Sequence, residues 1–485
     1  MRRSRALALA AATLLAASLT VAETLSASAA TTSFGSGAAS FVTSTAPAYD
    51  GSSFFQSDAA GEPSIGLDWK TGAAMYMAGT DTYKVTFDNT TGAASWADRS
   101  SPYSVFNLDP ILATEHTSGL TLAGGDNGAC AVMSSTTNDG GSAAFDSSAW
   151  TPTLPCPLAV DHPTVGFGPF AGGTPIGATG SFASYFCQQE ALLDECSHSW
   201  DGGLTWSPSV PDTNLDCESL FGHIKASPDG TAYIPNSNCF DANSNLVVGG
   251  LTTTDNGLTL GGYGIAGAPT PARGFDPSIA TTSDNTVYET WSRAGDYHPV
   301  VASSTDHGKT WSAQTDLAST VPGLTAATFE SAVGGDAGRV AIAFLGTKDT
   351  DQANTPFDPA FKGQWELYVA YTYDGGATWT TTQVTPDSDP VQIGGINDGG
   401  FSSTDHRNLL DFMDASATKD GRVVVAYADG CPPGCTTSAD SSHARASVAY
   451  QLGGEGLFAA YDGGALAAAP ATTTTTNLIG RLTKH

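Results

Sequence analysis

Seven stretches of this 485-residue sequence place an acidic residue or a histidine just ahead of a short apolar segment. The residues are Glu62, Asp109, Asp161 with His162, His223, Asp276, Glu330 and Asp411. Carboxylates and imidazoles are the side chains that most often move protons in enzymes, and carboxylates also bind cations and sugar hydroxyls. Crowded carboxylates repel one another, which raises the pKa of one of them and leaves it protonated as a candidate acid. If the fold gathers these residues, they predict an acid/base or binding site.

A second series of motifs shows how the chain is built. The stretch SWDGGLTW at 199–206 recurs as STDHGKTW at 304–311 and as TYDGGATW at 372–379, with looser copies elsewhere. The Asp positions of this series are Asp88, Asp139, Asp201, Asp255, Asp306 and Asp374, which lie 51 to 68 residues apart. In five of six units, a residue of the first series follows the motif Asp by 21 to 24 residues. Two series in a fixed phase indicate one structural repeat with the length of a propeller blade.

Strand-like runs fill the space between the two series. In the fifth unit, PSIATTS, TVYETWS, HPVVASST and WSAQTDL are rich in β-branched and aromatic residues and are separated by turn residues. Four strands in each of seven units predict an all-β fold, a seven-bladed β-propeller over residues 31–464. Six blades are the alternative, if one looser unit is not a blade.

Propeller topology determines where each series lies. The first strand of a blade lines the central channel, so the residues just before it converge on one mouth of that channel. The turn between the third and fourth strands lies on the opposite face. A catalytic Asp repeated around a ring would serve no single active site, so we interpret Asp201, Asp306 and Asp374 as turn residues.

The motif S/T-x-D-x-G-x-T-W resembles the Asp-box (BNR) repeat of sialidases and related secreted glycosidases. The segments GEPSIGLDWKTG, DHPTVGFGPF and RNLLDFMDA are similar to an actinobacterial group of secreted sialidase-like proteins. The resemblance implies an Asp-box propeller whose box forms the turn between strands three and four. Sialidases of this family use an arginine cluster, a Tyr nucleophile assisted by Glu, and an Asp acid/base. The sequence has no F/Y-R-I-P motif, which marks the first arginine of that family.

We therefore predict a site at the mouth, with roles assigned by residue type. The catalytic candidates are Glu62, Asp161, Asp276 and Glu330, and the substrate-binding candidates are Arg273, Arg293, Arg407, His162, His223, Asp109 and Asp411. Tyr297, Trp365 and Phe401 fall in loops on the same side and are candidates for stacking on sugar rings. No cofactor and no metal ligand set is expected, with a structural or mouth-bound calcium ion left open.

Two functions fit such a mouth. The first is exo-acting glycoside hydrolysis by a sialidase-like enzyme, with the arginines gripping a substrate carboxylate. The second is a non-catalytic propeller that binds an extracellular glycan or protein. In that alternative, each carboxylate caps its own turn and the arginines form ordinary ion pairs with an acidic surface.

The chain is strongly acidic, with a formal net charge of −29. Residues 1–30 combine a basic start, an Ala/Leu run and small residues, which is typical of a secretory signal peptide. Their removal leaves 16 of 19 basic and 47 of 48 acidic residues, a net charge of about −31. Such a surface repels nucleic acid and anionic membranes, and no later apolar run is long enough to span a bilayer. We expect a secreted monomer that binds carbohydrate or a glycoconjugate.

Eight cysteines in an exported chain predict disulfides. Proximity suggests the pairs Cys130–Cys156, Cys187–Cys196, Cys217–Cys239 and Cys431–Cys435. Residues 465–485 are rich in Ala and Thr and are predicted to be a disordered tail.

Overall fold

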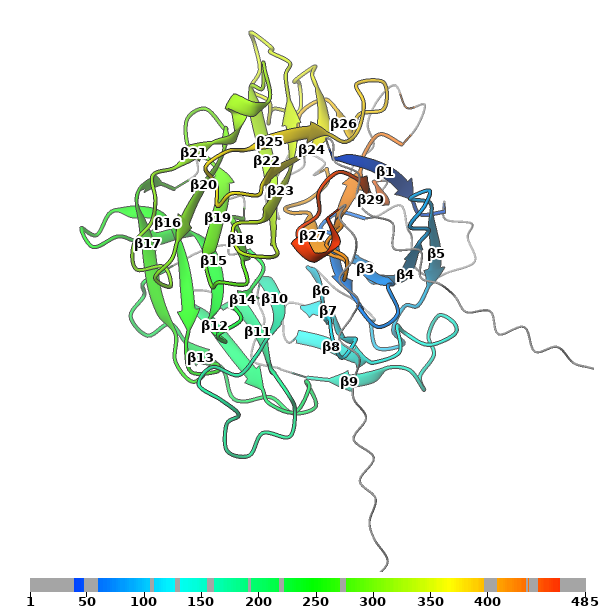
Figure 1. Ribbon diagram of the computed structural model, residues 1–485, viewed down its shortest axis with the longest axis vertical. Helices are drawn as coiled ribbons and strands as arrows, with labels where there is room; N and C mark the ends of the chain where they lie inside the picture. Colours follow the sequence, from blue (N-terminus) through cyan, green and yellow to red (C-terminus); the bar gives the residue numbers. More distant parts are fainter. Residues whose placement is uncertain are drawn as a thin grey trace, which may run out of the picture. The chain divides into compact units, whose positions relative to one another are not determined.

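Seven antiparallel sheets follow one another around a central axis in the computed structural model (Figure 1). The structure describes residues 39–47, 60–104, 109–126, 131–154, 161–190, 193–217, 222–270, 276–396, 408–432, 435 and 444–462. These all belong to one structural unit, Ser33–His485. The seven-bladed β-propeller is confirmed, and the six-bladed alternative is wrong. The predicted signal peptide and tail lie outside the described residues.

The first two strands of each blade form its inner half. The first strands are β2 (Ser64–Leu67), β6 (Pro110–Glu115), β10 (Asp161–Gly168), β14 (Lys225–Ala226), β18 (Ser278–Thr281), β22 (Ala326–Gly334) and β27 (Asp414–Ala417). Each contacts the first strand of the next blade, and β27 contacts β2, so these strands close a ring. The second strands are β3 (Ala74–Ala78), β7 (Leu120–Asp126), β11 (Ala183–Glu190), β15 (Ala232–Phe240), β19 (Val287–Ser292), β23 (Val340–Thr347) and β28 (Val423–Asp429).

The outer half of each blade holds the third and fourth strands. The third strands are β4 (Asp81–Phe87), β8 (Ala131–Thr136), β12 (Leu193–Ser199), β16 (Leu246–Thr253), β20 (Pro299–Ser304), β24 (Gln364–Thr372) and β29 (Arg445–Gly453). The fourth strands are β5 (Ala94–Asp98), β9 (Thr151–Thr153), β13 (Val210–Pro211), β17 (Gly261–Pro269), β21 (Thr315–Asp316), β25 (Thr380–Gln383) and β1 (Ser40–Thr45). A short strand, β26 (Gln392–Ile393), also pairs with β24, and two 3-10 turns, η1 (Leu317–Thr320) and η2 (Ala459–Tyr461), are the helical segments among the described residues.

The core lies between the blades. The second strands β3, β23 and β28 are buried along their whole length, because both faces of each sheet pack against a neighbouring blade. Their sequences AMYMA, VAIAFLGT and VVVAYAD supply the small and β-branched side chains that such packing needs. Tyr76 of blade 1 packs with Val424 and Val448 of blade 7 in one apolar cluster, which joins the last blade to the first.

The N-terminal strand completes the last blade. Strand β1 pairs antiparallel with β29, from Phe41 opposite Gln451 to Thr45 opposite Ser447. Figure 1 shows β1, in dark blue, beside β29, in orange. The ring is therefore closed by backbone hydrogen bonds between the two ends of the domain. The repeat spacing does not show this, because β1 precedes the first unit.

The box motifs form turns between third and fourth strands, as expected. Asp201 follows β12, and its carboxylate accepts the backbone N–H groups of Leu204 and Thr205 at 3.0 and 2.9 Å and the Thr205 hydroxyl at 2.5 Å. Gly202 and Gly203 have φ values of 78° and 81°, which glycine adopts without strain. The carboxylates of Asp255, Asp306 and Asp374 accept the same type of hydrogen bonds from the following threonine. Each of these carboxylates therefore accepts its hydrogen bonds from residues of its own turn.

The assignment of Asp139 to this series is wrong. The box position in blade 2 belongs to Asn138, which accepts the Thr136 hydroxyl at 2.8 Å, while Gly140 N–H donates to the Thr136 oxygen. Asp139 instead pairs with Lys84 at 2.8 Å. In blade 2, the amide of Asn138 takes the place of the box carboxylate. A search for Asp in this motif therefore finds the next residue, Asp139.

Three of the four expected disulfides are present: Cys187–Cys196, Cys217–Cys239 and Cys431–Cys435. Cys130 and Cys156 lie outside the described residues. Cys187 and Cys196 are direct cross-strand partners in β11 and β12. In the part of the chain described, no helix has the length and apolar character to cross a membrane.

Candidate functional site

The predicted mouth residues lie at the starts of the first strands. Glu62, His223 and Asp276 come two residues before β2, β14 and β18. His162 and Glu330 are instead inside β10 and β22, each at a point where the pairing register shifts. Such bulges commonly redirect a side chain in a strand. The repeat period therefore located the strand entrances but not the two bulges.

His162 is the residue on which the other candidates converge. Its Nδ1 lies 3.5 Å from a carboxylate oxygen of Asp276, and its Nε2 lies 3.8 Å from one of Asp411. Its backbone N–H donates to Asp109 at 3.2 Å. Blades 2, 3, 5 and 7 thus each contribute one residue, which requires that all four entrances meet near the axis. Because only a closed ring brings these blades together, the cluster depends on the whole fold.

The backbone of His162 is held in an unusual conformation. Its φ is 47°, a left-handed value that costs energy for a residue other than glycine. Glu62, at the entrance of blade 1, has a φ of 55°, and its N–H donates to the carbonyl of Leu409. Such values persist where the surrounding structure enforces them, and they concentrate at functional sites. The hydrogen bond from His162 to Asp109 is part of what fixes this geometry.

Burial sets the protonation of Asp276. This side chain is 6% exposed, and burial raises its pKa above the usual range while the imidazole of His162 opposes part of that rise. The nearby carboxylate of Asp411 raises the pKa of Asp276 further. Asp276 is therefore a carboxyl group that holds its proton to higher pH than a surface Asp. Because the imidazole of His162 lies beside it, Asp276 can donate a proton to that ring or accept one from it.

A second layer of charge lies directly under this cluster. Asp414, at the start of β27, lies 3.4 Å from His223 Nδ1 and 3.6 Å from Lys225 Nζ, and it accepts the backbone N–H of Ile65 at 3.1 Å. Burial alone would raise the pKa of Asp414, but Lys225 and His223 hold it at about 2. Asp414 is thus a buried carboxylate that stays ionised and orients His223.

Asp414 and Lys225 were not predicted as site residues. Both lie at the starts of first strands, where β2 and β18 have Ser64 and Ser278. Aligning these four units strand by strand would have shown a charged residue at a position that holds a serine in β2 and β18.

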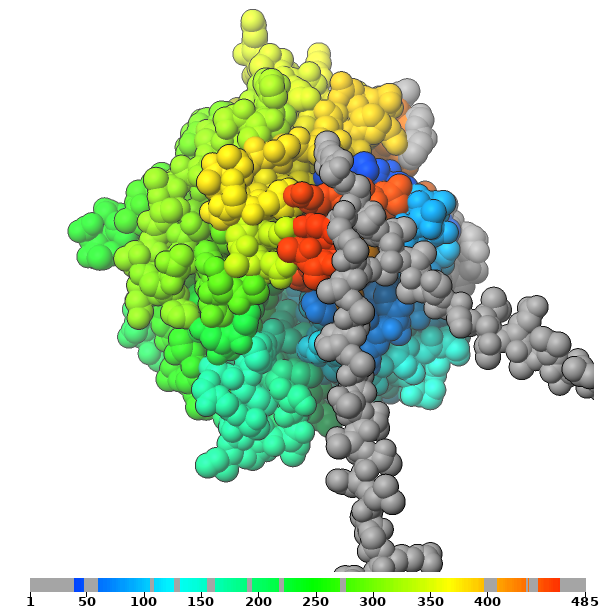
Figure 2. Space-filling view, viewed as in Figure 1, coloured from blue at the N-terminus to red at the C-terminus, as the bar shows by residue number. Residues whose placement is uncertain are grey.

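Below these layers the channel is largely apolar. A cavity of about 720 Å³ runs along the first strands, with His223, Lys225 and Asp414 in its wall. Every blade contributes at least one apolar residue to its wall, among them Ile65, Leu112, Val165, Ile224, Ile279, Ala332 and Ala415. The last described residues, in red, lie close to the middle of the face in Figure 2, and Phe458 among them lines the cavity. The His162 cluster does not line this cavity, whose polar residues include Glu115 and His116 as well as His223, Lys225 and Asp414.

Glu330 is held apart from the His162 cluster. Its Oε1 accepts the hydroxyl of Ser292 at 2.8 Å, and the side chain is 4% exposed. Burial raises the pKa of Glu330 to about 7, against a lowering by the Ser292 hydrogen bond. Its Oε2 is buried without a hydrogen-bond partner among the described residues. Glu330 is thus a carboxyl group that is partly protonated near neutral pH.

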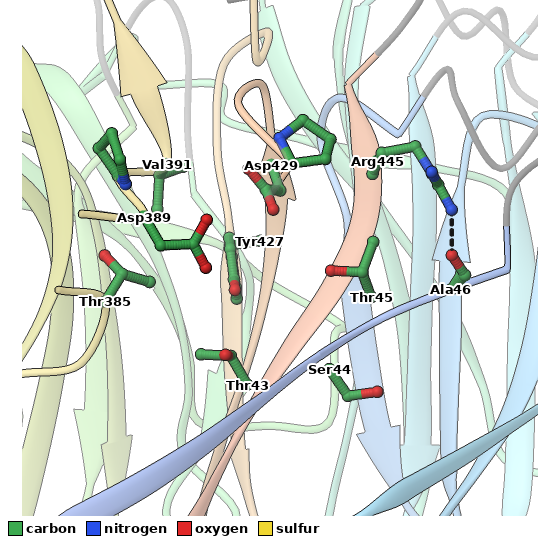
Figure 3. Close-up of a pocket in the computed structure, with 12 residues that line it drawn as sticks. Thr43, Ser44, Thr45, Ala46, Thr385, Asp389, Val391, Tyr427, Asp429 and Arg445 are labelled. Atoms are coloured by element: carbon green, nitrogen blue, oxygen red, sulfur yellow. Dashed lines mark hydrogen bonds between the residues drawn. The ribbon is translucent and has the colours of Figure 1, made fainter. Parts of the chain in front are cut away.

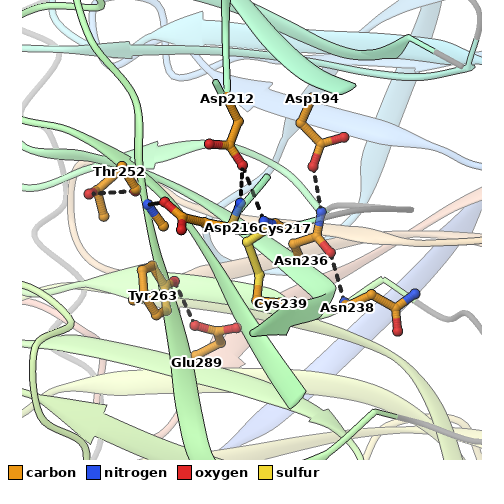
Figure 4. The surroundings of a disulfide bond; sticks show 12 residues. Asp194, Asp212, Asp216, Cys217, Asn236, Asn238, Cys239, Thr252, Tyr263 and Glu289 are labelled. Carbon is orange, nitrogen blue, oxygen red and sulfur yellow. Dashed lines mark hydrogen bonds between the residues drawn. A yellow bond between two sulfur atoms is a disulfide. The ribbon is translucent and has the colours of Figure 1, made fainter. Parts of the chain in front are cut away.

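A further buried carboxylate, Asp194 on β12, was not predicted. It accepts a hydrogen bond from Asn236 at 2.7 Å, beside the Cys217–Cys239 disulfide (Figure 4). Burial and the charge of Asp212 raise the pKa of Asp194 to about 8, and His162 lowers it in part. Asp194 therefore lies within electrostatic range of His162. Asp194 lies inside a third strand, so it does not belong to the series of polar residues that precede the first strands.

Of the three arginines predicted to bind substrate, Arg293 lies in the described part of the chain. Its guanidinium binds Asp296 and Asp316, each at 2.6 Å. Asp296, His298 and Asp316 place ligand atoms within 4.8 Å of one another, but the guanidinium already occupies these carboxylate oxygens. The guanidinium is therefore held in ion pairs, as the alternative of ordinary ion pairs expects, and the substrate-binding role of Arg293 stays a prediction. Arg273, Arg407 and the side chain of Asp161 lie outside the described part.

The prediction that Trp365 stacks on a sugar ring is wrong. This side chain is fully buried, donates to the carbonyl of Gly394 at 3.0 Å and packs on Phe357. Tyr297 is half-buried and packs on Phe357 at a centroid distance of 4.8 Å. Phe401 lies outside the described residues. Trp365 belongs to the core of blade 6 and cannot stack on a sugar.

No protein-family model and no curated protein matches the chain. Among solved structures, it is similar to a protein of unknown function from Dyadobacter fermentans, with 15% identity over 81% of this chain and 94% of that chain, at a TM-score of 0.37. It is also similar to an intramolecular trans-sialidase from Ruminococcus gnavus, with 13% identity over 84% of this chain and 98% of that chain, at a TM-score of 0.39. An intramolecular trans-sialidase from leech is similar with 12% identity over 84% of this chain and 70% of that chain, at a TM-score of 0.41. Likeness at these identities and TM-scores carries no argument about activity, so the site itself must support a function.

Proposed function

We propose that this chain is a secreted, carbohydrate-active propeller that hydrolyses glycosidic bonds in an exo fashion at its mouth. The observation that carries the proposal is the convergence of Asp109, Asp276 and Asp411 on His162. The resemblance of the box motifs and entrance segments to sialidase-like proteins supports the same class. The signal-like segment 1–30 and the three disulfides support secretion.

The geometry suggests a role for each residue. Asp276, whose pKa is raised, donates its proton to the glycosidic oxygen as the bond to the anomeric carbon breaks. Asp411 accepts a proton from the water that attacks that carbon, which restores the balance of protons. His162 lies between the two carboxylates and can return a proton from Asp411 to Asp276. Asp109 positions His162 through its backbone. Carboxylates are also good acceptors for the hydroxyl groups of a sugar.

The substrate-binding roles proposed for Arg273 and Arg407 are still predictions, as is that of Asp161 in catalysis. A neutral sugar suits the mouth best, because the surface is strongly acidic and Arg293 is already neutralised by carboxylates. We expect carbohydrate as the ligand of a monomer, with no nucleic acid or membrane partner.

One observation favours the non-catalytic alternative. Asp276, Glu330 and Glu62 are 6%, 4% and 1% exposed, which leaves little of each carboxylate accessible to a substrate. In that case the mouth binds a glycan through its outer residues, and the buried carboxylates hold the blades in place.

The two functions separate in one experiment. Neutral aryl glycosides and sialosides are incubated with the purified chain and with Asp276→Asn, and both hydrolysis and glycan binding are measured. An exo-hydrolase releases a single terminal sugar, and Asp276→Asn lowers kcat at least about a hundredfold while binding persists. Binding without hydrolysis by the folded wild-type chain would reject the enzyme and favour the binding module.

A further inference from the structure

The channel cavity of about 720 Å³ opens on the face that carries the box turns, away from the mouth. Its exposed lining residues come from the loops between the first and second strands of blades 2 to 5: Thr117, Pro169, Ser181, Pro228 and Ser283. One of these loops touches the box turn of blade 4, where the N–H of Ala171 donates to Asn256 at 2.7 Å. The volume of the cavity suits a drug-sized molecule.

The wall of this cavity is aliphatic along the strands and aromatic at the open end. The aromatic residues are Trp69, Phe167, Phe182 and Phe458. Phe167 meets Phe182 edge to face at a centroid distance of 5.6 Å, and Trp69 stacks on His116 at 4.6 Å. Each of these rings is only partly buried, which leaves aromatic surface for a ligand. Such a wall favours an apolar ring over a sugar, most of whose hydroxyls would face groups that accept no hydrogen bond.

One ammonium group interrupts the apolar wall. Lys225 lines the cavity with its side chain 31% exposed, and its Nζ lies 3.6 Å from a carboxylate oxygen of Asp414. That distance is longer than a hydrogen bond, and Nζ has no hydrogen-bond acceptor within the described chain. By contrast, Lys84 is 27% exposed and its Nζ donates to Asp139 at 2.8 Å. Because an ammonium carries three donors, Lys225 has hydrogen bonds to offer a molecule in the cavity.

His116, in the same wall, supplies an acceptor. Its Nδ1 lies 2.8 Å from the carbonyl oxygen of Leu67, so Nδ1 carries the proton and Nε2 is the acceptor of a neutral ring. Burial lowers the pKa of His116, which keeps the ring neutral, while the hydrogen bond to Leu67 opposes part of the change. The charge of Lys225 lowers this pKa further, so the ammonium lies within electrostatic range of the imidazole. A donor and an acceptor thus share one apolar cavity.

A cavity at the seam between blades 6 and 7 lacks this combination. It measures about 480 Å³, and polar side chains form much of its lining: Thr43, Thr385, Asp389, Asp429 and Arg445 (Figure 3). Tyr427 is its aromatic residue among those described, and Arg445 donates to the carbonyl of Ala46 (Figure 3). A compound that entered this cavity would not respond to a change at Lys225, which lines only the channel.

We propose that the channel cavity binds an uncharged, mostly apolar ring compound that carries a hydroxyl group. The hydroxyl oxygen accepts a hydrogen bond from Lys225 Nζ, the hydroxyl donates to His116 Nε2, and the ring packs on the aromatic and aliphatic wall. An anion is disfavoured, because the ionised Asp414 lies beside Lys225 and Glu115 adds a second carboxylate to the lining. A cation is disfavoured by Lys225 itself. The proposal is independent of any activity at the mouth.

Binding of β-naphthol to the full chain, followed by the fluorescence of the compound, tests this proposal. Naphthalene lacks the hydroxyl group, and β-naphthoate carries a negative charge in its place, so the three probes separate the hydroxyl from the ring. We expect β-naphthol to bind at least about tenfold more tightly than either of the others, because a hydrogen bond from a charged donor adds to the burial of the ring.

Three variants locate the site. Lys225→Met should weaken the binding of β-naphthol at least about tenfold but that of naphthalene less than about twofold, which also shows that the variant keeps its cavity. Lys84→Met is the matched control, because it removes an ammonium of similar exposure from another carboxylate, and it should leave both affinities unchanged. Ala113→Leu enlarges a side chain that lines the cavity and should weaken both probes.

A second polar variant covers the case in which Lys225→Met does not fold. His116→Asn keeps an amide that can donate to Leu67 but removes the acceptor at Nε2, so it should also weaken β-naphthol more than naphthalene. The proposal is overturned if the wild type binds β-naphthol no better than naphthalene, if β-naphthoate binds most tightly, or if Lys84→Met loses as much affinity as Lys225→Met. Selective loss of β-naphthol in Lys225→Met or His116→Asn supports it.

Discussion

Carboxylates recur on both faces of this propeller, but the two faces place them in opposite environments. On the box face, the side chain and backbone N–H of Thr310 donate to Asp306 and hold its pKa at about 2. On the mouth face, burial raises the pKa of Glu330 to about 7. The box carboxylate is stabilised by its own turn, whereas the mouth carboxylate is held by contacts between blades. Chemistry near neutral pH is therefore possible at the mouth and not at the boxes.

The largest expected effect on stability comes from the charged layer under the mouth. Asp414→Ala removes a buried carboxylate that contacts His223, Lys225 and the backbone N–H of Ile65, and it leaves the partly buried Lys225 ammonium without its counter-ion. We expect the free energy of unfolding to fall by about 3 kcal/mol or more. Chemical denaturation measures it, with Asp229→Ala, which breaks an exposed contact with His307, as the control that should cost less than about 1 kcal/mol. Equal losses in the two variants would remove the distinction between mouth and surface carboxylates.

Glu330→Gln should change how stability depends on pH. A Glu in the unfolded chain ionises with a pKa near 4.5, whereas the folded Glu330 keeps its proton to about pH 7. Glu330 therefore stabilises the fold below pH 4.5, and this contribution of about 3 kcal/mol is lost as pH rises through 7. Denaturation of wild type and Glu330→Gln across this range should show the difference. Parallel pH profiles for the two proteins would contradict the raised pKa.

A box carboxylate should give the opposite sign. Burial raises the pKa of Asp201, but the hydrogen bonds from Thr205 outweigh it and the net pKa is lowered. Its contribution is present above the unfolded pKa and is lost as pH falls through the lower folded value. We expect Asp201→Ala to cost about 1 kcal/mol at neutral pH and to cost less in acid. Denaturation at both pH values checks this, and a cost that grows in acid would be inconsistent with the turn geometry.

The smallest effect is expected at the rim. Arg293→Ala breaks ion pairs with Asp296 and Asp316 that are partly exposed, so it should cost less than about 1 kcal/mol. Turnover of a sialoside or any other anionic glycoside should be unchanged. A large rise in KM for such a substrate would show that Arg293 leaves its carboxylates to bind the ligand.

The fold was predictable because the repeat is local. Each box turn is encoded by a few adjacent residues, so its spacing in the sequence gives the blade period. Asp139 was misassigned because Asn138 performs the same hydrogen bonding with an amide. The pairing of β1 with β29 was not visible, because it joins residues some 400 positions apart with no motif in β1.

The candidate site was predictable only in part. The period placed Asp109 and Asp276 at strand entrances, but it showed neither the bulge that holds His162 nor the longer spacing to Asp411, and the closed ring brings all four together. The spacing of the motifs does not show whether a side chain is buried or which residues it contacts. Trp365 is in the core, and the carboxylate partners of Arg293 lie 3 and 23 residues away along the chain. Such contacts depend on how loops fold back over the blades.

The most direct test compares one carboxylate from each face in a single assay. Asp276→Asn and Asp306→Asn make the same chemical change, at the mouth and at a box turn, and kcat/KM is measured on the glycoside that the wild type hydrolyses best. A catalytic mouth predicts a loss of at least about a hundredfold for Asp276→Asn and wild-type activity for Asp306→Asn. Wild-type activity in folded Asp276→Asn, or an equal loss in both variants, would contradict a catalytic mouth.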